Sequence, residues 1–407
     1  MATLKSERSI LLLLAAVQFC NIVDFMIMMP MGHQLMETFS ISAQQFSWLV
    51  SSYTFSAGVS GFVMVFFADR FDRKRLLLQM FTGFTVGTFF CAVAPTFEFL
   101  LVSRLITGVF GGVLGSIVMS IVGDLVPVSR RGYGMGMINT AFSMASVIGV
   151  PLGLFLATSI SWHAPFLFIV ALALPLIVLL WKKVPSMRSH IGEETPRAYE
   201  VLAVIFRNSN QRRALLFVCV LMFAHFSIIP FLSPSMVANV GFREEDLAWI
   251  YFLGGGVTIL TGPWIGRMAD RFGKQKIFLV GGTLALVPCF LITHLGPTPL
   301  PLALLVTTLF FIASGGRIIP AMAITSSTVT PKNRGSFMSL QSCLQQISLG
   351  FASLLAGWIV VKDSQTGTLL NYPYVGYISI VMGIVCLYLI RKIRIVESET
   401  KGVVVEA

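Results

Sequence analysis

The sequence predicts an all-α membrane protein with twelve transmembrane helices in two pseudo-symmetric six-helix bundles. Three observations support this: an apolar composition, a series of apolar runs of membrane-spanning length, and an internal repeat. Residues of the set AVILMFWYC make up 56% of the 407 residues and charged residues only 12%, about half the charged share of soluble domains. A soluble protein of this size cannot bury so much apolar surface and still present a polar exterior, so the composition excludes one.

Twelve segments are long and apolar enough for a helix that crosses the bilayer, which needs about 20 residues. In the first half they are residues 9–30, 46–67, 76–94, 99–122, 133–158 and 162–181. In the second half they are residues 214–237, 247–268, 277–294, 301–325, 336–361 and 374–390. We therefore expect an N-terminal bundle at 1–181 and a C-terminal bundle with a short tail at 214–407.

The central segment 182–213 joins the two expected bundles. Tyr199, Leu202, Ile205 and Phe206 recur in it at helical spacing among basic residues. This amphipathic pattern is typical of a short helix that lies along the membrane surface. A solvated tether between the bundles is the alternative.

Basic residues lie almost entirely on one side of the expected membrane. With the N-terminus in the cytoplasm, every Lys and Arg falls in a cytoplasmic segment except Arg104, Arg243, Arg317 and Lys362. This asymmetry follows the positive-inside rule. The net charge of +11 therefore marks orientation rather than a nucleic-acid partner, and we expect both termini in the cytoplasm.

An internal repeat relates the two halves. A shift of 201 residues places Ala68–Phe71 on Ala269–Phe272, which are four contiguous identities in the loop after the second span of each half. The same shift pairs Trp48 with Trp249. Such repeats are typical of secondary transporters built from two related bundles.

The repeated loops also carry a recognisable motif. Residues 66–75 read FFADRFDRKR and residues 266–274 read GRMADRFGK. Both resemble motif A of the major facilitator superfamily, roughly G-x-L-A-D-R-x-G-R-K, although Val65 and Asp72 stand where glycine is usual. The resemblance extends over the chain through the twelve spans, the half-repeat and the long central segment, and it implies the major facilitator fold.

A carboxylate beside a helix end, with guanidinium partners, can hold two helices together on one side of the membrane. The resemblance assigns this cytoplasmic gate to the repeated loops, and to an acidic-x6-Arg partner around the loop between spans 4 and 5. A merely solvated turn is the alternative. The expected gate residues are Asp69, Arg70, Arg73, Asp124, Arg131, Asp270 and Arg271.

Two further motifs indicate which branch of the superfamily the chain resembles. Arg104, Gly108 and Gly112 form R-x-x-x-G-x-x-x-G, which resembles motif B of proton-driven members. Both glycines also suit close helix packing. Residues 149–153, which include Pro151, resemble motif C of the antiporter branch with the Gly-Pro order broken. The branch with the greatest similarity is that of the drug:proton antiporter-1 and sugar-efflux-like bacterial exporters, which implies a bacterial inner-membrane protein; we expect a monomer without a cofactor.

Asp24 is the only carboxylate well inside an expected span, and an ionisable group there is a functional candidate by default. It shares a helix face with Gln18, Asn21 and Met28. Desolvation favours its neutral form, whereas a nearby Arg104 would favour its charged form. A carboxyl group so balanced can take up a proton and release it when the local geometry changes. The alternative is a permanent Asp24–Arg104 ion pair that fixes packing.

Two basic groups also lie inside spans. His225, one 201-residue shift from Asp24, can accept a proton near neutral pH, contact substrate, or be hydrogen-bonded in the bundle. Arg317 either pairs with a helix end or offers its charge to an anionic substrate. Polar side chains form one face of span 5 and one face of span 11. We expect these faces either to contact substrate or to hydrogen-bond between helices. The candidate substrate-binding residues are Asn21, Asn139, His225, Arg317, Gln341 and Gln345.

Alternative functions follow from other features. Five methionines at positions 26, 28, 29, 31 and 36 surround His33, and thioethers suit Cu(I), but flexible apolar filling is the preferred interpretation, so no metal is expected. No P-loop and no nucleophile–base pair is found, so we expect neither ATP drive nor an enzyme. We expect proton-coupled export of a drug-like, sugar-like or metabolite molecule by alternating access. Uptake by symport or facilitation, metal or siderophore transport, and a membrane sensor that does not transport are alternatives.

Overall fold

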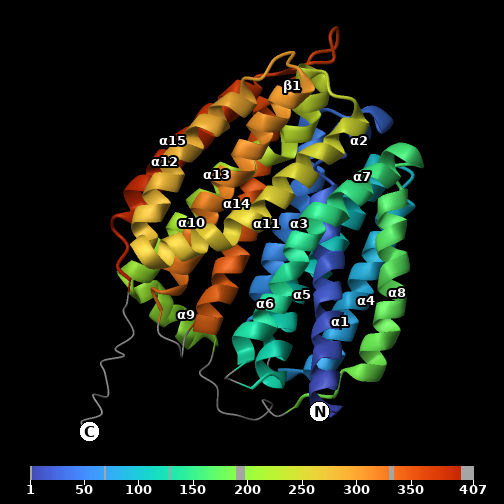
Figure 1. Cartoon of the computed structure of the whole chain (residues 1–407). Coiled ribbons are helices and arrows are strands. Elements are labelled where there is room, and N and C mark those ends of the chain that lie inside the picture. Colours follow the sequence, from blue (N-terminus) through green and yellow to red (C-terminus); the bar gives the residue numbers. More distant parts are fainter. Residues whose placement is uncertain (1, 68–69, 128–129, 189–197, 330–333, 396–407) are drawn as a thin grey trace.

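The computed structural model describes residues 2–67, 70–127, 130–188, 198–329 and 334–395. Long helices run side by side along the molecule (Figure 1). The strands in the described residues are β1 (Val361–Lys362) and β2 (Leu369–Leu370), which form a short antiparallel hairpin.

The long helices occupy the twelve expected spans, which confirms the fold class. The first half contains α1 (Ala2–Ile27), α3 (Ala43–Met64), α4 (Arg73–Ala92), α5 (Phe97–Leu125), the continuous run of α6 (Arg131–Met144), η3 (Ala145–Gly149) and α7 (Val150–Ser159), and α8 (Ala164–Lys183). The second half contains α10 (Ser209–Ser235) continued by η4 (Met236–Val240), α11 (Leu247–Phe272), α12 (Lys274–Thr293), α13 (Leu300–Ser326), α14 (Arg334–Ile359) and α15 (Tyr372–Ile390).

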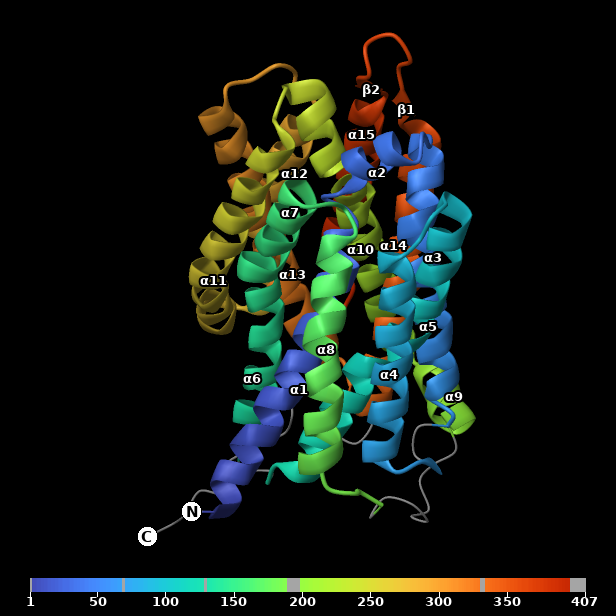
Figure 2. The same cartoon turned by 90° about the vertical axis from the view of Figure 1, so that its right-hand side faces the viewer.

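Three shorter helices join these elements: α2 (Gly32–Thr38), α9 (Ala198–Arg207) and the 3₁₀ turn η5 (Glu244–Asp246). We call the end of the molecule that carries α2 and the β1–β2 hairpin the hairpin end (Figure 2). The opposite end carries α9 and the start of α4, and we call it the basic end (Figure 2). The central amphipathic pattern is helical in α9, where Ile205 is fully buried.

Eleven helices in the described part of the chain are long and apolar enough to cross a membrane. The exception among the twelve is α3, which has 22 residues and is rich in hydroxyl groups. Ser47, Ser52 and Thr54 each donate a hydrogen bond to a backbone carbonyl one turn earlier in α3. Because these hydroxyl groups are satisfied within the helix, α3 fits an apolar environment. It packs between α5 and α14, both of which are among the eleven (Figure 2).

The end of the first span differs from the expectation. α1 ends at Ile27, and residues 28–31 form a turn before α2 begins. Met28 therefore lies beyond the helix that carries Asp24, and our prediction that the two share a helix face was wrong. The end of α1 is not visible in hydropathy, because residues 27–31 are apolar throughout.

The fifth span contains a π-helical turn. This turn, η3, ends two residues before Pro151, and proline cannot donate the backbone hydrogen bond that a regular helix needs. A Cβ atom at Gly149 would lie 2.3 Å from Cγ2 of Val23, and one at Gly153 would lie 2.6 Å from Cδ1 of Ile27. The segment that resembles motif C therefore packs closely against α1.

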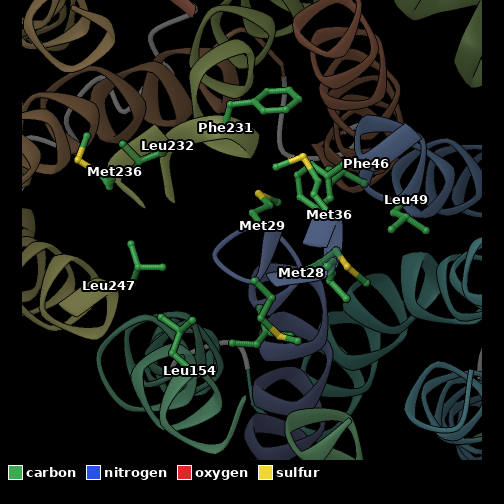
Figure 3. Close-up of a cluster of buried hydrophobic side chains, with 14 of the residues drawn as sticks. Met28, Met29, Met36, Phe46, Leu49, Leu154, Phe231, Leu232, Met236 and Leu247 are labelled. Atoms are coloured by element: carbon green, nitrogen blue, oxygen red, sulfur yellow. The ribbon is translucent and has the colours of Figure 1, made fainter. Parts of the chain in front are cut away.

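Buried apolar side chains form three clusters. The hairpin-end cluster contains residues of both halves, including Met36 and Phe46 with Phe231 and Met236 (Figure 3). The buried members of the other two clusters come from one half each, residues 10–187 and residues 205–393. The two halves therefore share a core at the hairpin end, whereas their cores toward the basic end are separate.

Candidate functional site

An ion pair lies in the interior of the first half. Nη1 of Arg104 donates to Oδ2 of Asp24 at 2.7 Å, and the two side chains are 1% and 0% exposed. Thr88 of α4 donates its hydroxyl to Oδ1 of Asp24 at 3.1 Å. The guanidinium carbon of Arg104 lies 4.5 Å from the ring centroid of Tyr53 on α3. Four helices thus converge on one carboxylate, and sequence reasoning missed Thr88 and Tyr53.

Close packing of α5 against α3 positions Arg104. A Cβ atom at Gly108 would lie 2.4 Å from the carbonyl oxygen of Tyr53, and one at Gly112 would lie 2.4 Å from Cα of Ala57. Only glycine permits such an approach of two helix backbones. Arg104 lies one turn before Gly108 on the same face, so its guanidinium is brought onto the Tyr53 ring.

Asn21 joins three helices beside this pair. The Tyr53 hydroxyl donates to Oδ1 of Asn21 at 3.0 Å, and Nδ2 of Asn21 donates to the carbonyl of Gly111 at 3.3 Å. One turn away, Oε1 of Gln18 is buried without a described partner. The geometry gives Asn21 a packing role, and its role in substrate binding stays a prediction.

The second half holds a pair of basic residues between the corresponding helices, α10 and α13. Nη2 of Arg317 donates to Nδ1 of His225 at 3.1 Å. Arg317 is 3% exposed, and its Nε is buried without a partner in the described part of the chain. The His225 ring stacks on Phe310 with centroids 5.6 Å apart. The described contact of Arg317 is thus with a neutral ring nitrogen.

Two of the three remaining substrate candidates lie together. Nε2 of Gln341 and Nε2 of Gln345 approach Sδ of Met322 at 3.3 and 3.7 Å. Oε1 of Gln341 is buried and lacks a partner among the described residues. Asn139 is exposed on α6, and no contact among the described residues joins it to these glutamines.

The gate candidates among the described residues lie at the basic end. Nε of Arg73 approaches Oδ2 of Asp124 at 3.4 Å, which joins the start of α4 to the end of α5. Asp69 lies outside the described residues. Arg70 and Arg271 stack over the neighbouring rings Phe67 and Phe272.

Two gate candidates make other contacts. Nε of Arg131 donates to the carbonyl of Val126 at 3.3 Å, at the end of α5, rather than to Asp124. Asp270 is exposed near the end of α11. The described gate contacts therefore lie within single halves in this conformation.

Asp72 replaces the glycine of the motif and caps α4. Its carboxylate accepts hydrogen bonds from the Arg75 backbone amide at 3.2 Å, from Nε of Arg188 at 3.1 Å, and from the Ser186 hydroxyl. Burial pushes the pKa of Asp72 up, but these hydrogen bonds outweigh burial and lower its pKa to about 2. Asp72 thus stays charged and ties the start of α4 to the segment after α8.

Two polar contacts at the hairpin end join ionisable side chains of the two halves, and neither was found from the sequence. Nδ1 of His33 lies 3.0 Å from Oε1 of Glu244, and Nζ of Lys362 lies 2.5 Å from Oε1 of Glu37. His33 and Glu37 are on α2, whereas their partners belong to the second half. α2 therefore binds the second half through both ends of its short length.

The methionines near His33 fill apolar space. Met28, Met29, Met31 and Met36 are 1–3% exposed in the hairpin-end cluster (Figure 3). No group of three or more His, Cys, Asp or Glu side chains in the described residues could hold a metal ion. The burial of these methionines among apolar side chains agrees with their interpretation as apolar filling.

Comparisons with known proteins agree on the family. A sequence profile of the Major Facilitator Superfamily matches residues 14–316 and 214–405. The uncharacterized MFS-type transporter YceJ of Bacillus subtilis is 25% identical over 367 residues, which cover 89% of this chain and 92% of YceJ. The probable sugar efflux transporter of Helicobacter acinonychis is 22% identical over 241 residues, 59% of this chain and 61% of that protein.

A solved structure shares the fold. The bacterial homolog of the human lysosomal transporter Spinster, in its inward-facing unoccupied conformation, superimposes with a TM-score of 0.77. The match covers 95% of this chain and 98% of that chain at 16% identity.

Proposed function

The chain belongs to the Major Facilitator Superfamily, and on that basis we propose that it is a proton-coupled transporter that exports a small molecule by alternating access. The observation that carries this proposal is the buried ion pair of Asp24 and Arg104. An ionisable pair with no exposure inside a membrane span is costly. This cost is explained if the carboxylate takes up and releases a proton in each transport cycle.

The chemistry of the pair supports coupling. A proton on Asp24 would remove the charge that holds Arg104, leaving the guanidinium with the Tyr53 ring as its partner. Because breaking a buried pair costs several kcal/mol, the protonated state would favour a rearranged packing of α1, α4 and α5. Loss of the proton would restore the pair. Asp24 is thus the proton-coupling group and Arg104 its partner.

Orientation follows from charge. The basic end faces the cytoplasm, as the positive-inside rule requires, and the hairpin end faces the outside of the inner membrane. Because the halves share a core at the hairpin end, the structure corresponds to a state closed toward the outside. Residues 1–181 and 214–407 would be the two bodies that rock against each other in a monomer. The gate contacts would form between these bodies at the basic end in the opposite state.

Export is favoured over uptake by the relatives, one of which is named as a probable sugar efflux transporter. Motifs B and C, as they stand at Arg104 and around Pro151, support the same direction. Uptake by proton symport is the second candidate, and the fold serves both directions.

The test uses purified protein in liposomes that contain the pH-sensitive dye pyranine. Compounds found by a thermal-shift screen of drugs, sugars and metabolites are added under pH gradients of either sign. We expect compound-driven proton movement opposite to the compound, and none in Asp24→Asn. Glu98→Gln, the same chemical change at an exposed residue of α5, is the control. Unaltered proton movement in Asp24→Asn would refute the coupling role, and movement in the same direction as the compound would establish symport.

A further inference from the structure

We propose that Arg317 and His225 form a binding site for an anionic group, a carboxylate, sulfonate or phosphate, on the transported molecule. The proposal rests on the transport function for the use of this site, but its binding chemistry stands on contacts of its own.

Charge balance is the first argument. The buried charged side chains of the described residues are Asp24, Asp72, Arg73, Arg104 and Arg317. The first four each have an oppositely charged partner. Arg317 has no acidic partner within the described residues, and its described contact is the His225 ring. A buried charge without compensation costs several kcal/mol, so this position is suited to a counter-ion that comes from outside the protein.

The hydrogen-bonding pattern is the second argument. Because an arginine only donates, the bond from Nη2 of Arg317 makes Nδ1 of His225 an acceptor. The ring proton must then reside on Nε2, which makes His225 a donor on its other side. Nε of Arg317 is a further buried donor without a described partner. The pair therefore presents donors and no free acceptor, the complement of an oxyanion.

The guanidinium group suits such a ligand. A carboxylate, sulfonate or phosphate accepts two parallel hydrogen bonds from one arginine, an arrangement stronger than bonds between neutral groups. His225 supports Arg317 in position because its ring is stacked on Phe310. An amide or a hydroxyl group of a neutral compound could satisfy one donor but not the charge.

Two amides of the second half also lack a strong acceptor. The side chains of Gln341 and Gln345 both direct Nε2 at the thioether of Met322, a weak acceptor. Met322 follows Arg317 by five residues on α13, toward the basic end. Oxygen atoms of a polar ligand would be better acceptors for these two amides than sulfur is.

The internal repeat places different chemistry at one position of the two halves. A shift of 201 residues places His225 of α10 on Asp24 of α1. In the first half the residue at this position is a carboxylate, and it neutralises an arginine of α5. In the second half it is an imidazole, which leaves Arg317 of α13 uncompensated. The charge of Arg104 is neutralised within the protein, whereas that of Arg317 is neutralised by the bound ligand.

The experiment measures ligand-induced thermal stabilisation of the full chain in nanodiscs. The probes are benzoate and benzenesulfonate, each paired with its neutral counterpart, benzamide and benzenesulfonamide. A ligand that binds only the folded state raises the melting temperature with its concentration. We expect the anions to stabilise the wild type at concentrations about tenfold or more lower than the neutral compounds do. Arg317→Gln should lose this preference, and Arg317→Lys should retain part of it.

Two controls keep the result interpretable. Arg212→Gln removes the same charge from an exposed position on α10 and should behave as the wild type. If Arg317→Gln does not fold, His225→Gln keeps the charge and removes the stacked ring, and should weaken anion binding. Equal stabilisation by anions and neutral compounds, an unchanged preference in Arg317→Gln, or tight Asp24-dependent binding of tetraphenylphosphonium would overturn the proposal.

The anion site and the proposed proton coupling can be refuted independently of each other. Asp24→Asn should keep the anion preference while it loses proton movement in the pyranine assay. If the wild type shows no anion preference but its proton coupling is intact, the anion site alone is refuted. Intact preference with unaltered coupling in Asp24→Asn would refute the coupling role alone.

Discussion

At the position of Asp72 and Gly273, the two copies of the repeated loop differ in backbone conformation as well as in side chain. Gly273 has φ of +95° and ψ of 128°, a conformation that residues with side chains rarely adopt. The corresponding residue of the first half, Asp72, has φ of −58°. The first loop therefore follows another path, in which the carboxylate caps α4. The departure from the glycine of motif A is a local change of backbone as well as of side chain.

A residue-scale prediction follows for Asp72. Because its folded pKa is lowered to about 2, the charged carboxylate stabilises the fold above its ordinary pKa of about 4. That contribution is lost as the pH falls from about 4 toward 2. We expect Asp72→Ala to lower the free energy of unfolding by about 0.5–2 kcal/mol at pH 7, the value of an N-cap. Asp72→Asn keeps a capping oxygen and should lose less.

The measurement is the denaturation midpoint of wild type and both variants at pH 7 and pH 3. The difference between the wild type and Asp72→Asn should shrink at pH 3. A difference that is the same at both pH values would contradict the assignment of the stabilising charge to Asp72.

At the scale of elements, the interface of α3 and α5 determines where Arg104 lies. A Cβ atom at Gly112 would approach Cα and the carbonyl oxygen of Ala57 at 2.4 and 2.5 Å. These are backbone atoms, so the helices themselves must move apart. Gly123 lies on the same helix, and a Cβ atom there would meet nothing within 4 Å.

We therefore expect Gly112→Ala to destabilise the protein by about 1–3 kcal/mol, the usual cost of overpacking. Gly123→Ala should be neutral or stabilising by up to about 1 kcal/mol, because alanine favours the helix. Melting temperatures of the two variants in the same detergent provide the comparison. Equal effects of the two substitutions would show that the α3–α5 contact is not tight.

The elements that the sequence predicted well are those with long apolar runs. All twelve spans are helical, because a helix satisfies the hydrogen bonds of its own backbone without water or a neighbouring segment. α2 and the β1–β2 hairpin were missed. α2 has seven residues and follows α1 after a four-residue turn at 28–31, and each strand has two residues. Patterns this short carry no periodicity that distinguishes them from a loop.

The candidate site was predictable only in part. Asp24 and Arg104 were found because charge within an apolar run is conspicuous. Tyr53 and Thr88 were not, because a hydroxyl group within an apolar helix is common and mostly bonds to its own backbone. The contact of Arg317 with His225 spans 92 residues, and no local pattern indicates it.

At the scale of the whole molecule, closure at the hairpin end rests on two kinds of contact. The ion pair of Lys362 with Glu37 on α2 is partly exposed, with the two side chains 28% and 56% exposed, so it contributes about 0–1 kcal/mol. Phe231 is fully buried against Phe46 of the other half, with ring centroids 5.9 Å apart. Removing a buried ring costs about 3–5 kcal/mol, so apolar contact should dominate the closed state.

The last prediction tests this ranking by access from outside. Ser235, 1% exposed and one turn from Phe231 on α10, is replaced by cysteine and labelled with a membrane-impermeant maleimide. Labelling of the parent chain without the substitution is subtracted. We expect Lys362→Ala to raise the labelling rate at most about fivefold, the equivalent of about 1 kcal/mol, and Phe231→Ala to raise it far more. Phe217→Ala removes an equally buried ring from the core of one half, so it should leave access unchanged. If Phe217→Ala raises labelling of the cysteine introduced at Ser235 as strongly as Phe231→Ala does, the effect is general unfolding. The shared core would then not control opening. An effect of Lys362→Ala as large as that of Phe231→Ala would instead assign closure to the ion pair of Lys362 with Glu37.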